Sequence, residues 1–256
     1  MKTHLVIPDQ HAHPQFNNER ADWIGQLIAD VKPDVVINIG DAADMASLSH
    51  HDKGKASFHG RNYGDDIDAH LNFQDRMWSP LRRLKKRWPH SVFLEGNHEN
   101  RIKRALETDP HLKGAISFSD LDLNPYYHEV VEYEGMTPSI YTIDGIAYAH
   151  FFISGVMGRA VGGEHPASSL LDKNHMSSTC AHSHTLDFAV KTKVGGQKLM
   201  GLVAGCAQDY RAPWAGSSND LWWSGVIVKR NVCDGVYDPQ FISLDALRKE
   251  YGSVKA

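Results

Sequence analysis

A short apolar run over residues 91–94 is followed by Gly96, Asn97 and His98. A segment typical of a helix begins directly afterwards and extends over residues 99–106. A strand that ends in polar residues just before a helix places those side chains at the carboxyl edge of a sheet, where open α/β sheets bind their ligands. This stretch therefore predicts an α/β fold with an amide and an imidazole at one edge of a sheet.

Two further strands are expected to end in the same way, over residues 5–7 and 35–39. A helix over about residues 17–31 separates them, with apolar side chains recurring at helical spacing. A strand, a helix and a strand form a βαβ unit, so the two strands should be parallel neighbours with a right-handed crossover. Their polar ends should then lie side by side, and these ends contain Asp9, His11, Asp41 and Asp44.

The remaining elements follow from apolar periodicity and turn residues. Expected helices lie near residues 69–88 and 166–173 and from residue 245 onward. Expected strands lie near residues 130–131, 141–143, 146–150, 177–180, 188–191, 198–204, 225–229 and 240–244. Residues 46–68 are polar and rich in His, and we expect a flap-like insertion there. We interpret residues 1–256 as a single domain with an α/β first half and a β-rich second half.

Composition disfavours several classes of protein. The 256 residues carry a net charge of −4, whereas non-specific binding of duplex DNA needs clustered Lys and Arg. Cysteines number three, without a Cys-x-x-Cys pair, and an odd count argues against a disulfide framework. No apolar run approaches the roughly 20 residues that cross a bilayer, and the first residues lead into a strand rather than a signal peptide. We expect a cytoplasmic protein without membrane association, and its oligomeric state is left open.

The residues at the strand ends, together with later histidines, form a set of carboxylates, imidazoles and one amide. Mixed oxygen and nitrogen donors suit Mn, Fe, Zn, Co or Ni rather than Ca or Mg alone. Seven ligands are too many for one ion, whereas two ions about 3.5–4 Å apart can share a bridging carboxylate and clamp a phosphoryl group. The candidate ligands are Asp9, His11, Asp41, Asn97, His150, His182 and His184.

The order of these residues resembles the calcineurin-like metallophosphoesterases. The family pattern is Asp-x-His, Gly-Asp-x-x-Asp, Gly-Asn-His-Asp/Glu, a later His, and Gly-His-x-His. Order and spacing agree here, with Ala in place of the Gly of the last motif. The resemblance implies a four-layer α/β/β/α sandwich of two mixed sheets. The motifs read Asp9-Gln10-His11, Gly40-Asp41-Ala42-Ala43-Asp44, Gly96-Asn97-His98-Glu99, His150 and Ala181-His182-Ser183-His184.

The resemblance also implies a role for each residue. Asp41 would bridge two divalent metal ions, with Mn favoured for activity. His98 would assist the leaving group and Asp44 would orient it, which agrees with the need for an acid near the leaving oxygen. One ion would be held by Asp9, His11 and His184, and the other by Asn97, His150 and His182.

The implied activity is hydrolysis of phosphate esters by a hydroxide that bridges the two metals. Met45 and Ala46 stand where protein phosphatases of the superfamily have Arg-Gly. The missing Arg favours a phosphodiesterase acting on a nucleotide or single-stranded nucleic acid. A phosphomonoesterase acting on small or protein substrates is the alternative. A non-catalytic metal-binding scaffold is a remote alternative, because such scaffolds usually lose ligands that this chain keeps.

Three residues outside the motifs are candidate substrate contacts. Arg159 lies in a glycine-rich loop after His150 and would grip a phosphate. Tyr210 and Arg211 lie in an aromatic segment that would stack a nucleobase, or alternatively packs at the end of the sheets. Arg101 is expected to pair with a carboxylate near the site. The basic and His residues of the flap either line the entrance or form a solvated face.

Overall fold

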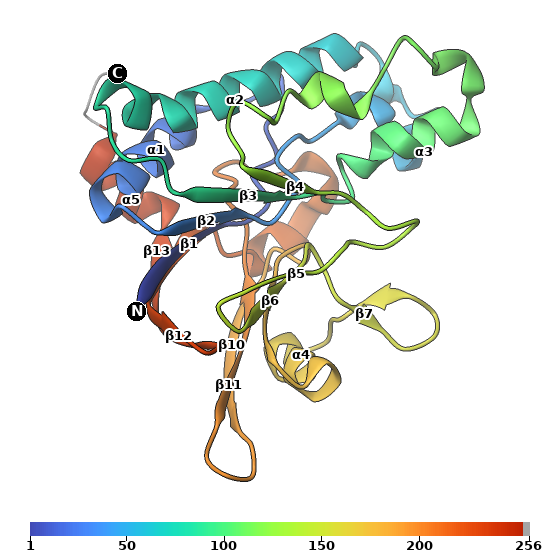
Figure 1. The fold of residues 1–256 in the computed structure, drawn as a ribbon. Coiled ribbons are helices and arrows are strands. Elements are labelled where there is room, and N and C mark those ends of the chain that lie inside the picture. The colour runs from blue at the N-terminus through green and yellow to red at the C-terminus, as the bar shows by residue number, and fades with distance from the viewer. Residues whose placement is uncertain (253–256) are drawn as a thin grey trace.

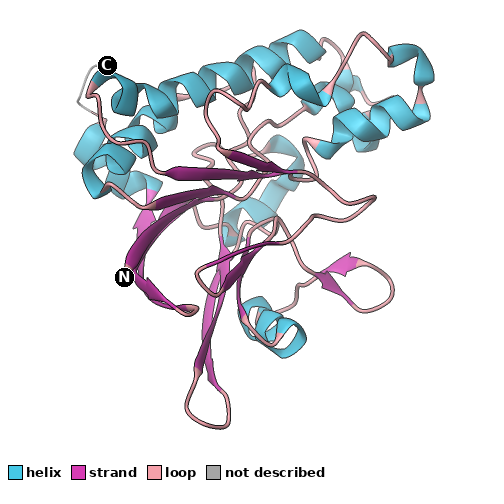
Figure 2. Cartoon of the chain, in the orientation of Figure 1, coloured by secondary structure: helices cyan, strands magenta, loops and turns pink. Residues whose placement is uncertain are grey.

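The computed structural model describes residues 1–252, which form two sheets packed face to face with helices on both outer faces (Figure 1). Figure 2 shows the helices gathered mainly above the first sheet and one helix against the second. The fold class expected from the sequence, a four-layer α/β/β/α sandwich with two mixed sheets, is confirmed. No helix among the described residues is long and apolar enough to cross a membrane.

The first sheet has the strand order β13-β12-β1-β2-β3-β4. Its parallel strands are β1 (Lys2–Ile7), β2 (Val35–Asn38), β3 (His90–Leu94) and β4 (Glu129–Val131). The last two strands of the chain, β12 (Gly225–Cys233) and β13 (Val236–Ser243), return to this sheet and pair antiparallel beside β1. The β-rich second half of the chain therefore completes the sheet that the first half begins.

The second sheet has the order β10-β11-β9-β6-β5. Its strands β6 (Ile146–Tyr148), β9 (Ser177–Cys180) and β11 (Lys198–Ala204) are parallel, whereas β5 (Tyr141–Ile143) and β10 (Leu186–Thr192) pair antiparallel at its edges. A separate ribbon of β7 (Ile153–Ser154) and β8 (Arg159–Ala160) occupies the glycine-rich loop.

Alternate side chains of the central strands face opposite layers, as the twofold period of a strand requires. Leu5 and Ile7 of β1 pack with the helices, while Val6 packs between the sheets against residues such as Tyr148 and Leu202. The helices on the first sheet are α1 (Glu19–Val31), α2 (Tyr63–Arg83), α3 (Asn100–Thr108) and α5 (Leu244–Tyr251), and α4 (Pro166–Asn174) packs on the second.

The expected helix over residues 69–88 is wrong in both bounds. It begins at Tyr63 because the side chain of Asn62 accepts a hydrogen bond from the Gly64 amide at 2.7 Å. It ends at Arg83, and Lys85 has a left-handed backbone with φ 48°. The segment before it forms three short 3-10 turns. Asp52 of the second turn pairs with Arg61, which follows the third turn, at 2.8 Å.

Candidate metal centre

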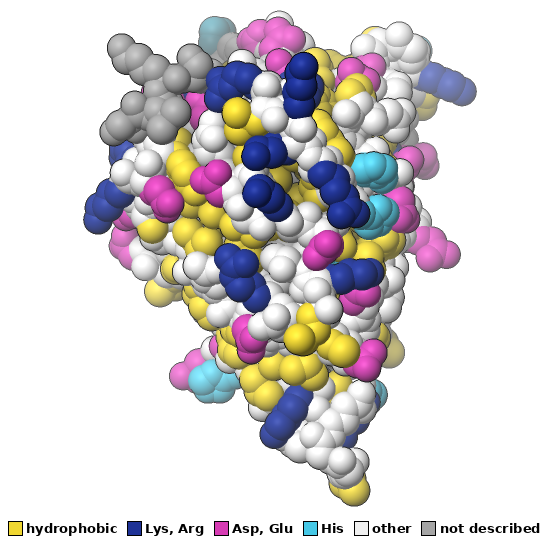
Figure 3. All heavy atoms as spheres, turned by 60° about the vertical axis from the view of Figure 1, so that its left-hand side comes forward, with side chains coloured by type: hydrophobic (Ala, Val, Ile, Leu, Met, Phe, Trp, Pro, Cys, Tyr) yellow, Lys and Arg dark blue, Asp and Glu magenta, His cyan; other side chains and the backbone are white. Residues whose placement is uncertain are grey.

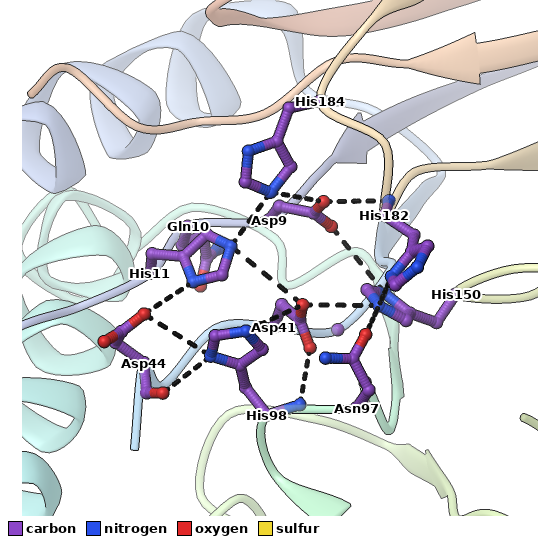
Figure 4. A network of polar contacts seen from close by, with 12 residues as sticks. Asp9, Gln10, His11, Asp41, Asp44, Asn97, His98, His150, His182 and His184 are labelled. Carbon is purple, nitrogen blue, oxygen red and sulfur yellow. Dashed lines mark hydrogen bonds and ion pairs between the residues drawn. The ribbon is translucent and has the colours of Figure 1, made fainter. Parts of the chain in front are cut away.

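The carboxyl ends of β1, β2, β3, β6 and β9 converge on one cluster of polar side chains (Figure 4). Parallel strands end at the same edge of their sheet, and here the edges of both sheets meet. The structure thereby brings together all seven candidate ligands and the His98–Asp44 pair. Most of these side chains are buried, and Asp9 and His150 are fully enclosed.

Four of these residues adopt a backbone conformation that L-residues rarely take. The φ angles are 44° for His11, 49° for Asp41, 68° for His182 and 60° for His184. Such left-handed residues cost about 1–3 kcal/mol each and persist where the surrounding structure enforces them, which is common at functional sites. Each turns the chain sharply after its strand, and no feature of the sequence marked these positions as strained.

The first group of donors consists of Asp9, His11 and His184. The Nε2 atom of His184 lies 3.2 Å from Asp9 Oδ2 and 3.0 Å from His11 Nε2. The other ring nitrogen of His11 donates to the Asp44 carboxylate at 2.9 Å. Because a carboxylate only accepts, that nitrogen carries the hydrogen and His11 Nε2 keeps its lone pair.

The second group consists of Asp41, His150 and His182, with Asn97 beside them. His150 Nε2 lies 3.3 Å from Asp41 Oδ2, 2.9 Å from Asn97 Oδ1 and 3.3 Å from His182 Nδ1. Its Nδ1 donates to the carbonyl oxygen of Ile39 at 2.9 Å, so Nε2 is the nitrogen that can bind a metal ion once its own proton is displaced.

Both groups fit a bound cation better than a closed hydrogen-bond network. His11 Nε2, His150 Nε2 and the oxygens of Asp9, Asp41 and Asn97 point toward one another, and they can all act as metal ligands once the proton on His150 is displaced. Asp9 Oδ1 and His184 Nδ1 are buried without any hydrogen-bond partner among the described residues. Buried polar atoms normally have partners, so converging acceptors with orphaned neighbours are consistent with a pair of metal sites.

The charges of the protein also favour a cation at this point. Burial lowers the pKa of His150, but the carboxylates of Asp41 and Asp9 outweigh burial and raise this pKa to about 9. Burial raises the pKa of Asp41, but His150 and His98 outweigh it and hold this pKa well below its usual value. Burial and the neighbouring His150 lower the pKa of His182 to about 4. A metal ion can replace the proton that the carboxylates attract.

Glu99 is a residue of the site whose part the sequence did not reveal. It is fully buried, and its carboxylate accepts hydrogen bonds of 2.9 Å from the backbone amides of Asp41, Ala43 and Gly96. Burial and the charge of Asp41 raise its pKa to about 7, while the amides act in the opposite direction. Glu99 joins the loops after β2 and β3, and its place in the Gly-Asn-His-Glu motif was the available signal.

His98 is held from both sides of its ring. Its Nδ1 donates to the backbone oxygen of Asp44 at 2.6 Å, and its Nε2 accepts from Arg101 at 3.0 Å. Arg101 also donates to the backbone oxygens of Asp44 and Met45 at 2.9 and 3.2 Å. The expectation that Arg101 pairs with a carboxylate is therefore wrong, because its partners are two carbonyls and an imidazole.

Two cavities adjoin the cluster, and they share Ser49, His51 and Arg101 in their walls. The larger, of about 1000 Å³, reaches His11 and His98, and we call it the aromatic cavity because Phe16, Tyr210 and Trp214 line it. The smaller, of about 410 Å³, reaches Asn97, and we call it the basic cavity.

The three candidate substrate contacts lie in different surroundings. Tyr210 lines the aromatic cavity, where its ring stacks on Phe16 at 3.7 Å and its hydroxyl donates to the His11 oxygen at 2.8 Å. Arg211 is exposed and pairs with Asp220 at 2.7 Å. Arg159 lies on the exposed strand β8, and neither cavity is lined by Arg159 or Arg211. The contact with Phe16 joins two segments that the sequence analysis did not connect.

No family model and no curated protein matches the sequence. Among solved structures, a conserved uncharacterized protein from Streptococcus pneumoniae TIGR4, described as a predicted phosphoesterase, matches 95% of this chain and 90% of its own. The identity is 12% and the TM-score 0.36. A second solved structure covers 94% of this chain and 99% of its own, with 10% identity and a TM-score of 0.36.

Proposed function

We propose that this chain is a metallophosphoesterase of the calcineurin-like type that uses two divalent metal ions and cleaves phosphodiesters of nucleotides or nucleic acid. The observation that carries the proposal is the convergence of buried donor atoms from five strand ends, with Nε2 of His11 and of His150 pointing into the cluster. Such a set of carboxylate, amide and imidazole donors suits Mn, Fe, Zn, Co or Ni, among which we favour Mn.

In this proposal Asp9, His11 and His184 would hold one ion, and Asn97, His150 and His182 would hold the other. Asp41 would lie between the two groups, because its Oδ2 is 3.9 Å from His11 Nε2 and 3.3 Å from His150 Nε2, and it would be shared by both ions. When bound, two such ions stabilise the charge on a phosphoryl group and lower the pKa of a water between them. The left-handed turns preorganise these donors before any ion binds.

His98 is the proposed acid at the leaving group. Its Nδ1 is engaged by the Asp44 backbone oxygen, so Nε2 is the atom that can hold and release a proton. Burial and Arg101 lower the pKa of His98, but Asp41 and Asp44 outweigh them and raise it. Nε2 accepts from Arg101 in this structure, so Arg101 must turn aside when His98 is protonated. The guanidinium is then free to contact a phosphoryl oxygen.

Two features support a diester rather than a monoester. No Arg follows Asp44, and the guanidinium that contacts the His98 ring comes from Arg101 of α3 instead. The two cavities meet at Arg101, so each can take one of the two groups esterified to the same phosphorus. A monoester has only one such group.

The test compares hydrolysis of bis-p-nitrophenyl phosphate and p-nitrophenyl phosphate with Mn²⁺ or Ni²⁺ added. We expect faster cleavage of the diester and a fall in kcat of about 10²–10⁴-fold for His98→Ala, the range for loss of a general acid. Metal content of both proteins is measured in parallel, because an equal content assigns the loss to proton transfer. Faster monoester cleavage would instead establish a phosphatase, and no metal-dependent turnover of either compound would contradict the proposal.

A further inference from the structure

The basic cavity carries an excess of positive charge that the protein does not neutralise. Lys53, Arg101 and Arg104 line it, and Asp109 is the carboxylate in its wall. The side chains of Lys53 and Arg104 form no hydrogen bond or ion pair within residues 1–252, whereas the Asp109 carboxylate accepts from the His111 amide at 3.1 Å. Three cations against one anion stand out in a chain whose net charge is −4.

The aromatic cavity has the opposite balance. Besides the shared Arg101, its cations are Lys55 and Arg61, which both pair with Asp52, at 3.0 and 2.8 Å. Further carboxylates in its wall are Asp44, Asp65 and Asp66. On the face shown in Figure 3, Lys and Arg are likewise interspersed with Asp and Glu. Carboxylates thus outnumber cations in the wall of the aromatic cavity, whereas cations outnumber carboxylates in the wall of the basic cavity.

The position of the basic cavity links it to the phosphoryl site. Asn97, a proposed metal ligand, lies in its wall, and Arg101 reaches from it to the ring of His98 at 3.0 Å. Arg101 uses three described hydrogen bonds, and a guanidinium has five N–H donors, so two remain for a ligand. Apolar side chains complete the cavity, which suits a sugar or base beside the charges: Leu48, Phe58, Ala105 and Leu112.

We propose that the basic cavity binds a second phosphate group of the substrate, next to the phosphate that is cleaved. This inference rests on the proposed phosphodiesterase function and narrows its substrate class to short single strands or nucleotides with at least two phosphate groups. Lys53 and Arg104 bind the second phosphate, and the groups on the other side of the scissile bond lie in the aromatic cavity. Neutralisation of neighbouring phosphates by Lys and Arg is the usual source of affinity for such chains.

The test uses the double variant Lys53→Met/Arg104→Met, with Arg83→Met, an exposed cation outside both cavities, as the matched control. Substrates are dithymidylate with one phosphate and dithymidylate phosphorylated at its 5′ or 3′ end. We expect the wild type and the control to cleave one phosphorylated form at least about ten-fold more efficiently, an advantage lost in the double variant. Hydrolysis of bis-p-nitrophenyl phosphate should stay within about two-fold, because it has no second phosphate.

A binding measurement separates this inference from the proposed function. Phosphorothioate-linked hexathymidylate and hexauridylate keep the backbone charges, resist hydrolysis and distinguish DNA from RNA. With Mn²⁺ present, we expect weaker binding by the double variant and a salt dependence reduced by about one to two released counterions. The second-phosphate site would be overturned if the wild type cleaved all the dithymidylates equally fast. It would also be overturned if the double variant kept the rate advantage for the phosphorylated form or bound the phosphorothioate strands as tightly as the wild type. A wild type that binds in this way but cleaves no diester would overturn the proposed function alone.

Discussion

The Nδ1 atom of His98 donates a 2.6 Å hydrogen bond to the backbone oxygen of Asp44, while the Asp44 carboxylate accepts from His11 Nδ1 at 2.9 Å. The same carboxylate is 3.4 Å from His98 Nδ1. The backbone of residue 44 therefore positions His98, and its side chain orients a proposed metal ligand. Burial raises the pKa of Asp44, but the hydrogen bond from His11 and the nearby His98 ring outweigh it and hold this pKa well below its usual value.

These separate roles of the backbone and the side chain of Asp44 predict the effect of Asp44→Asn. The neutral amide supports the His11 ring less strongly, so metal affinity should fall by about 10–100-fold. At saturating metal, kcat should fall by less than about ten-fold, because the carbonyl still holds His98. Metal titration and steady-state kinetics measure the two effects, with Asp68→Asn on the exposed side of α2 as the control. A loss of kcat equal to that of His98→Ala, with normal metal affinity, would make the carboxylate the orienting group of His98 after all.

Glu99→Gln should loosen the loops that carry Asp41 and Asn97. The carboxylate accepts three backbone N–H groups, and an amide nitrogen in place of one oxygen would face a donor with a donor. An unsatisfied buried donor costs about 1–3 kcal/mol, so the free energy of unfolding should fall by that amount. Urea unfolding checks this, and Glu107→Gln at the exposed end of the same helix should leave stability unchanged. Equal stability of the two variants would show that the carboxylate does not hold the loops together.

The burial of His70 leads us to expect that the free energy of unfolding falls in mild acid. It is fully buried, its Nε2 donates to the Leu121 oxygen at 3.2 Å, and burial lowers its pKa from 6.5 to about 4. Between these pH values the unfolded chain binds a proton that the folded chain does not, so stability falls as pH decreases from 6.5 to 4. The slope is at most about 1.4 kcal/mol per pH unit.

Urea unfolding at several pH values, for wild type and His70→Gln, measures this contribution. The glutamine keeps an N–H donor for Leu121 but does not titrate, so the variant should lose less stability on acidification. The difference in free energy of unfolding between the two proteins cancels the contributions of the other histidines. His111→Gln, at an exposed position, is the control. Identical pH dependence of wild type and His70→Gln would contradict the buried, neutral state of His70.

Lys229 is buried between the sheets without a carboxylate partner among residues 1–252. Its ammonium group contacts the hydroxyls of Thr179 and Tyr148 and lies 4.5 and 4.4 Å from the rings of Tyr148 and Tyr237. Burial lowers its pKa well below 10.5. The unfolded chain then binds the extra proton, so this residue makes stability rise as pH rises toward 10.5.

Replacing the amine with an apolar side chain of similar length removes a buried polar group. We expect Lys229→Met to raise the free energy of unfolding near neutral pH by about 1–3 kcal/mol and to flatten its rise with pH. Thermal and urea unfolding at pH 7 and pH 9 measure both effects, and Lys193→Met in an exposed loop is the control. A less stable variant would mean that the contacts of Lys229 with the hydroxyls and rings outweigh its desolvation.

The sequence by itself predicted the parts of this protein that depend on neighbouring residues. Apolar periodicity indicated the unit β1-α1-β2, and turn residues indicated the hairpin of β5 and β6. The polar residues after each strand were predicted to meet because parallel strands end at a common edge, and the structure brings them together. The resemblance, read from the order of the motifs, predicted the sandwich of two sheets.

Tertiary structure decided what depends on residues far apart in the chain. Three such contacts have no local signal in the sequence: the pairing of β12 with β1, the contact of Glu99 with the Asp41 loop, and the stacking of Phe16 on Tyr210. The sequence likewise does not indicate whether the backbone or the side chain of Asp44 forms the hydrogen bond with His98. Local spacing constrains only a few consecutive dihedral angles, whereas these contacts arise when packed layers fix which loops and charges face one another.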